Sequence, residues 1–443
     1  MLGLAIIDLL WGLLITVYQV RIIIRNRRIR IFNFSNLMFA FVYGFLPSLV
    51  LFRTESGTSV YAIDTSVSGI TYLSIATFLS VIVHICMNIA YNGTKAKKRM
   101  HEVTDNVAKT SGLVMLIIGW ISLFLWTRAD GGIFNFITHA DGIRAGYYHL
   151  NNPFAFLEHI TRVLLFAGCL TFSSWMQQRD LVGKAKMFIP AIGGIIGAFL
   201  FISAWDSRAA FGFFVLMIVL VHIEYRISIK QKVARTEIVR LAIILVLVLV
   251  LMVGSQSIMN SFRVGTYVSS GRSLNILDII ETEFGFVLKT QQAVIGNALN
   301  GTISLQILND LTNAIVAWIP SRFIPFEVPQ TLWRYNTLLV SGTAIHGTVP
   351  SDIVSSCISD LWFVGLLIIP FIYGRLLKRI DTLVATKEYH IYNSVLKCVF
   401  CTVAINQISH FSIATIVSGV FYIVLGHIIT LLVNRKNTAV ISG

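Results

Sequence analysis

Long apolar runs recur along the whole sequence and are separated by short polar stretches. A helix needs about twenty apolar residues to cross a bilayer, and lipid-exposed backbone must satisfy its hydrogen bonds within the helix. Hydrophobic residues make up 56% of the chain and charged residues only 13%, which is more apolar surface than a soluble domain of this length can bury. Eleven runs fall near 3–20, 31–52, 71–92, 112–127, 154–175, 187–204, 208–225, 240–258, 357–374, 391–408 and 412–433.

Lysine and arginine are unevenly distributed between the loops that join these runs. Of the 35 basic residues, 24 fall in every second loop and in the C-terminal tail, whereas nine fall in the other loops. Cytoplasmic loops carry the excess of positive charge in membrane proteins. The pattern predicts an all-α, polytopic integral membrane protein with about 11 transmembrane helices, its N-terminus outside and its C-terminus inside. It also accounts for the net charge of +14 without a nucleic-acid partner.

The predicted helices divide the chain into three parts. Residues 1–258 hold helices 1 to 8, residues 259–356 form one long outward (periplasmic) loop with short amphipathic helices, and residues 357–443 hold helices 9 to 11 and a cytoplasmic tail. Within the loop, the stretch 303–319 is apolar but is interrupted by Asn309, Asp310 and Asn313. It is expected to be a short helix on the membrane surface or a re-entrant element.

The basic residues of the outward loops are nearly all arginine: eight of nine, with Lys289 the exception. A guanidinium grips phosphate or carboxylate through two parallel hydrogen bonds, which an ammonium cannot do. An anion-binding outward surface is therefore expected; the alternative for any single arginine is a carboxylate partner or a lipid headgroup. Arg53 lies at the edge of an early loop with no motif around it, so Lys is expected to replace it without effect. The arginines expected to bind substrate are Arg144, Arg263, Arg272, Arg322 and Arg334.

Arg208 stands apart from the other outward arginines. A very short turn containing Asp206 and Ser207 joins two apolar runs and holds Arg208 at the membrane surface. A cation at the start of a helix opposes the helix dipole, and such local conflicts are expected at functional sites. The alternative is a simple ion pair between Arg208 and Asp206.

Two other polar groups lie beside apolar runs. In the fifth run, Glu158 and Arg162 are four residues apart and are expected to pair on one helix face. Upstream, the stretch 144–149 joins Arg144 to Tyr147, Tyr148 and a histidine. Aromatic faces with polar edges suit sugar rings, so Tyr147 is a substrate-binding candidate, although the same composition is typical of a membrane-interface belt.

Few residues suit acid–base or metal chemistry. His346 is expected outside the bilayer, where an imidazole could accept a proton or bind an oxyanion; the alternative is a solvated loop histidine. Cys398 and Cys401 lie inside an apolar run and are interpreted as packing residues rather than a redox pair. The outward loops contain no D-x-D motif, so no metal site and no cofactor is expected.

Together these features resemble the Wzy-type polymerases of bacterial surface polysaccharides, which are relatives of O-antigen ligase. The resemblance rests on the turn Asp206-Ser207-Arg208, on the long outward loop and on its exit. The exit runs from His346-Gly347 through Pro350-Ser351-Asp352 to Gly365 and the run Pro370-Phe371-Ile372-Tyr373-Gly374. The full histidine–asparagine pattern of the ligases is not present.

The resemblance implies a GT-C-like, metal-independent glycosyltransferase in the bacterial inner membrane, with its active site facing the periplasm. Its donor would be an oligosaccharide on undecaprenyl pyrophosphate, its acceptor a hydroxyl of the next lipid-linked unit, and its neighbours membrane lipid and a chain-length regulator protein. It also implies that Arg208 binds pyrophosphate with help from Arg322 or Arg334, and that His346 takes the place of the ligases' loop histidine.

Three other functions remain open. A flippase or transporter of lipid-linked sugar would show charges inside several helices and some repeat symmetry. An O-antigen ligase would differ only in its acceptor. A membrane scaffold without activity leaves the outward arginines unexplained.

Overall fold

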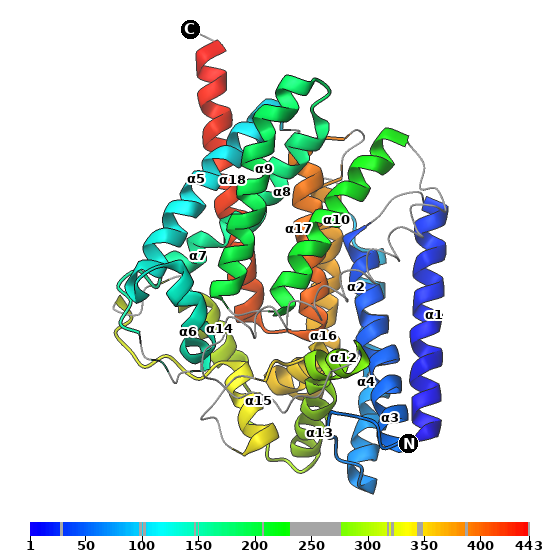
Figure 1. Ribbon diagram of the computed structural model, residues 1–443. Helices are drawn as coiled ribbons and strands as arrows, with labels where there is room; N and C mark the ends of the chain where they lie inside the picture. The colour runs from blue at the N-terminus through cyan, green and yellow to red at the C-terminus, as the bar shows by residue number, and fades with distance from the viewer. Residues whose placement is uncertain are drawn as a thin grey trace. The chain divides into compact units, whose positions relative to one another are not determined.

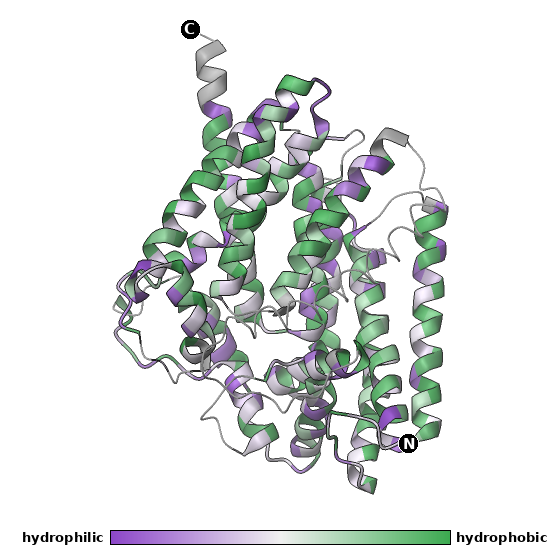
Figure 2. Ribbon diagram, in the orientation of Figure 1, coloured by the Kyte–Doolittle hydropathy of each residue, from purple (hydrophilic) through white to green (hydrophobic). Residues whose placement is uncertain are grey.

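The computed structural model describes residues 1–26, 30–96, 100, 103–145, 148, 150–205, 208–230, 276–316, 319, 323–342, 349–385 and 389–441. Within those ranges every regular element is a helix, which confirms the all-α prediction (Figure 1). The long helices are predominantly hydrophobic along their length (Figure 2).

Nine helical segments of the described residues are long and apolar enough to cross a membrane. They are Leu2–Arg25, Ile31–Glu55, Val67–Gly93, Asp105–Asp130, Leu181–Ala204, Ala210–Ile227, Ile353–Leu383, Ile391–Ser409 and Ile413–Arg435. Each corresponds to one predicted run. The predicted run 240–258 lies outside the described residues. The run 154–175 is divided at Arg162 into α7 (Leu157–Thr161) and α8 (Val163–Gln177), and α8 is only about 22 Å long.

The outer surface of α1 (Leu2–Asn26) illustrates why lipid is the solvent for these helices. Leu10, Leu14 and Val17 lie on one face and are 60%, 63% and 65% exposed. The polar side chains Asp8 and Gln19 are instead buried in the protein. This inside-out polarity is costly in water and favourable in hydrocarbon.

The described residues group into two compact units. The first comprises those of Met1–Lys98, Gly271–Thr382 and Val403–Val417, and the second those of Arg99–Ser270, Leu383–Thr402 and Ser418–Gly443. The three-part division predicted along the chain remains a prediction.

In the first unit, one span contains a widened turn. It consists of α2 (Ile31–Ala40), the π-helix η1 (Phe41–Phe45) and α3 (Leu46–Glu55). Pro47 has no N–H to donate to the Tyr43 carbonyl, and its ring would clash with that carbonyl in a regular α-helix. The widened turn relieves this conflict. Gly44 lies against Gly12 of α1, where an added Cβ would be 2.4 Å from the Gly12 Cα, so this close packing requires glycine.

The span formed by α16 (Ile353–Leu383) is broken near its start. Leu361 has φ −134° and ψ 22°, and Trp362 has φ 55° and ψ −158°, so two helical pieces meet here. Gly365 makes the junction possible, because a Cβ there would lie only 2.0 Å from the Cys357 carbonyl oxygen. The break places Asp360 at the end of the first piece.

The described part of the predicted outward loop folds into four short helices of the first unit: α12 (Ile276–Phe284), α13 (Phe286–Leu299), α14 (Ile307–Val316) and α15 (Leu332–Ser341). α14 falls in the stretch predicted to be a short amphipathic or re-entrant element. It buries Asp310 and Asn313 and leaves Leu308 and Ile315 75% and 70% exposed. An outward-facing apolar side fits a helix at the membrane interface.

The second unit includes α5 (Asp105–Thr127), α6 (Ile133–Ala145), α8, α9 (Leu181–Ala204) and α10 (Arg208–Lys230), with parts of α17 (Ile391–Ser409) and α18 (Ile413–Ile441). α8 and α9 pack closely through Gly168 and Gly194. Lys397 of α17, inside an apolar run, pairs with Glu224 of α10 at 2.7 Å. A buried cation needs such a partner, and the pair ties the two helices together.

Candidate functional site

The predicted pair of Glu158 and Arg162 is confirmed. The Arg162 Nη2 lies 2.7 Å from the Glu158 Oε1, and Arg162 is only 9% exposed. The guanidinium also lies over the ring of Trp205, 4.6 Å from its centroid. Its Nε is buried without a hydrogen-bond partner among the described residues. Arg162 therefore lies against Trp205, the residue that directly follows α9.

Arg208 begins α10, three residues beyond Trp205. α9 ends at Ala204, and Trp205 is its C-cap residue. The side chain of Arg208, together with Asp206 and Ser207, lies outside the described residues. The backbone places the start of α10 directly after the ring that covers Arg162.

An aromatic cluster joins this turn to α6. The Trp126 ring lies 4.7 Å from that of Phe136 on α6 and 6.0 Å from that of Phe201 on α9, measured between centroids. Phe201 in turn stacks on Trp205 at 6.0 Å. The ends of α5 and α9 and the starts of α6 and α10 therefore meet at one end of the second unit, the end predicted to face outward.

Of the remaining predicted site residues, Arg334 is described in full. It lies exposed in the first turn of α15, where its backbone N–H donates to the Thr331 hydroxyl, and it forms no ion pair with a described residue. Arg144 lies in the last turn of α6, but its side chain is not described. Tyr147, Arg263, Arg272, Arg322 and His346 lie outside the described residues.

Sequence reasoning did not assign a role to three aspartates buried in the first unit. Asp352 lies just before α16 and accepts hydrogen bonds from the Tyr43 hydroxyl at 2.5 Å and from the N–H groups of Val354 and Ser355. The widened turn of η1 carries Tyr43, and such turns are frequent at functional sites. Burial raises the pKa of Asp352, although its hydrogen bonds oppose this shift.

Asp310 and Asp360 are the other two of these buried aspartates. Asp310 accepts hydrogen bonds from the N–H groups of Ile413 and Ala414, and so caps the start of α18. Burial raises the pKa of Asp310 despite those two donors. Asp360 is fully buried at the break in α16, and neither of its carboxyl oxygens has a hydrogen-bond partner among the described residues. A polar residue interrupting an apolar run was the signal in the sequence that could have identified both.

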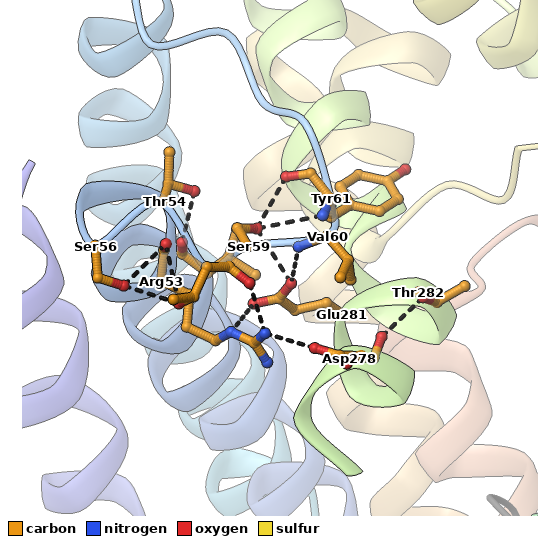
Figure 3. Close-up of polar contacts among 11 residues, drawn as sticks. Arg53, Thr54, Ser56, Ser59, Val60, Tyr61, Asp278, Glu281 and Thr282 are labelled. Carbon is orange, nitrogen blue, oxygen red and sulfur yellow. Dashed lines mark hydrogen bonds and ion pairs between the residues drawn. The ribbon is translucent and has the colours of Figure 1, made fainter. Parts of the chain in front are cut away.

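Arg53, around which the sequence shows no motif, has two acidic partners in the structure. Its guanidinium lies 2.5 Å from the Asp278 carboxylate and 3.1 Å from that of Glu281, both on α12 (Figure 3). The contact with Glu281 is an ion pair and not a hydrogen bond, because the Glu281 Oε1 accepts no hydrogen bond from a described residue. The other Glu281 oxygen accepts hydrogen bonds from the Ser59 hydroxyl and the Val60 N–H. Arg53, in the last turn of α3, therefore fastens α12 to that helix, and Glu281 fastens α12 to the loop that follows α3.

Metal and thiol chemistry find little support in the described residues. Among them, no group of three or more His, Cys, Asp or Glu side chains is arranged to hold a metal ion. All five cysteines are free thiols, and Cys398 and Cys401 are buried, in agreement with a packing role.

Helix length, hydropathy and the inside-out polarity define the chain as a polytopic membrane protein. Comparison with family models, with curated proteins and with solved structures found no match to the chain.

Proposed function

We propose that the chain polymerises lipid-linked oligosaccharide repeat units, transferring the growing glycan from undecaprenyl pyrophosphate to a hydroxyl of the next lipid-linked unit. The observation that supports this best is the position of Arg162 against Trp205, immediately before the helix that Arg208 begins. Two arginines thus belong to one aromatic-lined end of the second unit. In this proposal that end faces the periplasm, and the protein lies in the bacterial inner membrane.

The chemistry explains why arginines at this level are useful. Breaking the bond between the sugar and pyrophosphate leaves negative charge on a phosphate oxygen at the membrane surface. Hydrogen-bond donors that already point at the charge developing in the transition state typically make the largest contribution to the rate of such a reaction. Arg208 is assigned to the pyrophosphate and Arg162 is placed to support it. Arg144, Arg263, Arg272, Arg322, Arg334 and Tyr147 are assigned to the remaining anionic and sugar groups, and His346 is proposed as a second catalytic group.

The glycan pattern of a deletion strain tests the proposal. A polymerase mutant keeps one repeat unit on lipid A and loses every longer chain. Loss of all repeat units from lipid A would instead indicate a ligase or an earlier step and would contradict the proposal. A chain-length regulator is the expected protein partner, and its removal should alter chain lengths without abolishing polymer.

A transporter of lipid-linked oligosaccharide is the second candidate, and a specific observation favours it. The broken helix α16 ends its first piece at Asp360, a buried carboxyl without a hydrogen-bond partner among the described residues. Broken helices and buried ionisable groups are features of transporters. Detergent-solubilised protein separates the two functions, because glycan extension without any compartment requires a transferase.

A further inference from the structure

Asp130, His139 and Tyr148 form a hydrogen-bonded group at the end of the second unit that is predicted to face outward. The Asp130 Oδ2 lies 2.7 Å from the Nδ1 of His139, and its Oδ1 accepts a hydrogen bond of 2.8 Å from the Tyr148 hydroxyl. The two rings stack, with centroids 4.5 Å apart and an interplanar angle of 14°. Asp130 therefore joins two aromatic side chains, one through each carboxylate oxygen.

The local sequence explains this arrangement. Asp130 ends a short 3-10 turn, and Gly131 and Gly132 follow with φ of 81° and 119°, values that a side chain would disfavour. The chain thereby reverses into α6, whose second turn carries His139. Tyr148 returns to the same place because its N–H donates to the Gly142 carbonyl.

The partners of His139 determine which ring nitrogen carries its proton. The Asp130 side chain is only 6% exposed, and both of its oxygens act as acceptors. A carboxylate can only accept, so Nδ1 is the protonated nitrogen of the neutral imidazole. The Nε2 then presents its lone pair, and it has no hydrogen-bond partner among the described residues. The His139 side chain is 41% exposed, so the imidazole is partly open to the surroundings.

Tyr148 contributes an aromatic face. It is 38% exposed, and its hydrogen bond to Asp130 raises the pKa of its hydroxyl, which keeps the phenol neutral. The faces of sugar rings pack on aromatic rings, whereas sugar hydroxyls bond to polar groups at their edges. An oriented imidazole beside an open aromatic face therefore suits a sugar hydroxyl.

The group is connected to the arginine end described above. Phe136 lies one turn before His139 on α6 and packs against Trp126, which contacts the aromatic residues leading to Trp205. A donor pyrophosphate bound at Arg208 and a sugar bound at His139 would occupy the same end of the second unit.

We propose that His139, oriented by Asp130, is the general base that takes the proton from the acceptor sugar's hydroxyl, with Tyr148 supporting the sugar ring. This assignment rests on the proposed polymerase function. In the step, the hydroxyl oxygen forms a bond to the donor's anomeric carbon as the bond from that carbon to the pyrophosphate oxygen breaks. The proton passes to the Nε2 of His139, and the electron pair leaves with the pyrophosphate.

Purified full-length protein with undecaprenyl-pyrophosphate-linked oligosaccharide tests the assignment. A positioned general base typically contributes about a hundred- to ten-thousand-fold to a rate. H139Q should therefore lower kcat at least about a hundredfold with little change in KM. D130N should also lose most activity, because Asn can donate to Nδ1 and so move the proton to Nε2. Y148F should cost only a few-fold, whereas Y148A should raise KM.

Two further variants separate chemistry from folding. Added imidazole should partly restore activity to H139G, which a merely structural histidine would not permit. T138A is the matched control, because Thr138 is the neighbour of His139 on α6 and, among the described residues, its hydroxyl bonds only to the Phe134 carbonyl. T138A should retain wild-type activity.

The outcomes test the general-base role of His139 separately from the polymerase function on which it rests. If wild-type protein extends glycans and H139Q keeps its rate within about twofold, the role of His139 is overturned and the polymerase remains. The general-base role is also overturned if H139G elutes from a size-exclusion column as a folded protein but its activity does not rise when imidazole is added. If wild-type protein extends no glycan, both proposals fail.

Discussion

Arg162 carries a charge that is almost fully buried in the protein, and its contacts offset the cost of that burial. Glu158 neutralises it, and Trp205 presents an aromatic face to the guanidinium, an interaction of about 0.5–2 kcal/mol. The same contacts fix the residue that precedes the turn to α10.

Arg208→Lys tests whether the turn is built for anion recognition. The substitution keeps the charge and removes the two-pronged geometry, so glycan extension should fall about a hundred- to thousand-fold at normal protein levels. The matched control is Arg128→Lys, an exposed arginine that forms no ion pair with a described residue and should change little. Near-normal extension by Arg208→Ala would remove this residue from the site. Equal damage from Asp206→Asn and Arg208→Ala, with a mild Arg208→Lys, would support a simple ion pair.

Arg53 belongs to the structure rather than to the chemistry. Glu281 is fully buried, so Arg53→Met would leave its carboxylate without a cationic partner among the described residues. Breaking a buried pair in this way typically costs about 3–5 kcal/mol. Arg53→Met should therefore lower the thermal midpoint of the purified protein by several degrees, and Arg53→Lys should fall between it and wild type. A melting curve unchanged in Arg53→Met would show that α12 does not depend on this contact.

At the scale of single elements, the break in α16 is the least regular feature of the described chain. Trp362 has a positive φ, which a bulky residue adopts only where its surroundings enforce it. The second helical piece approaches the Cys357 carbonyl through Gly365. The break lies directly after Asp360, so the backbone geometry at Leu361 and Trp362 determines where this carboxyl group lies.

Gly365→Ala should disturb this junction. Its Cβ would lie 2.0 Å from a carbonyl oxygen, far inside van der Waals contact, so the backbone must shift. We expect a lower yield of folded protein and a lower thermal midpoint, by an amount typical of overpacking, about 1–3 kcal/mol. Gly419→Ala in α18 is the matched control, since nothing lies within 4 Å of its added Cβ. Equal melting of the two variants would contradict the close approach.

Contacts between residues close in the sequence were predicted better than contacts between residues far apart. The Glu158–Arg162 pair depends on neighbouring residues, and it was predicted correctly. The partners of Arg53 could not be predicted, because they lie more than 220 residues away, where no spacing rule applies. The break in α16 could not be predicted either, because Leu361 and Trp362 are ordinary residues for a membrane helix. The Asp130–His139 contact spans nine residues across two glycines, so the glycine pair was a usable but unused signal.

At the scale of the whole molecule, the orientation in the membrane is a prediction that rests on charge alone. Thr302, after α13, and Lys184, in the first turn of α9, are both exposed in the structure, so a cysteine introduced at either position should be accessible. An impermeant thiol reagent added to spheroplasts should label Thr302→Cys and spare Lys184→Cys. Four of the five native cysteines are buried, which keeps the background low. Labelling at Lys184→Cys in intact spheroplasts would reverse the predicted orientation.

The most direct test of the central proposal is glycan extension by the purified protein alone. Detergent-solubilised protein is mixed with undecaprenyl-pyrophosphate-linked repeat units and excess chelator, and the glycans are separated by length on a gel. We expect chains of two or more repeat units, formed without a divalent metal. Chains that stay at one unit under all conditions would contradict the polymerase, and chains that appear only after magnesium or manganese is restored would contradict the metal-independent mechanism.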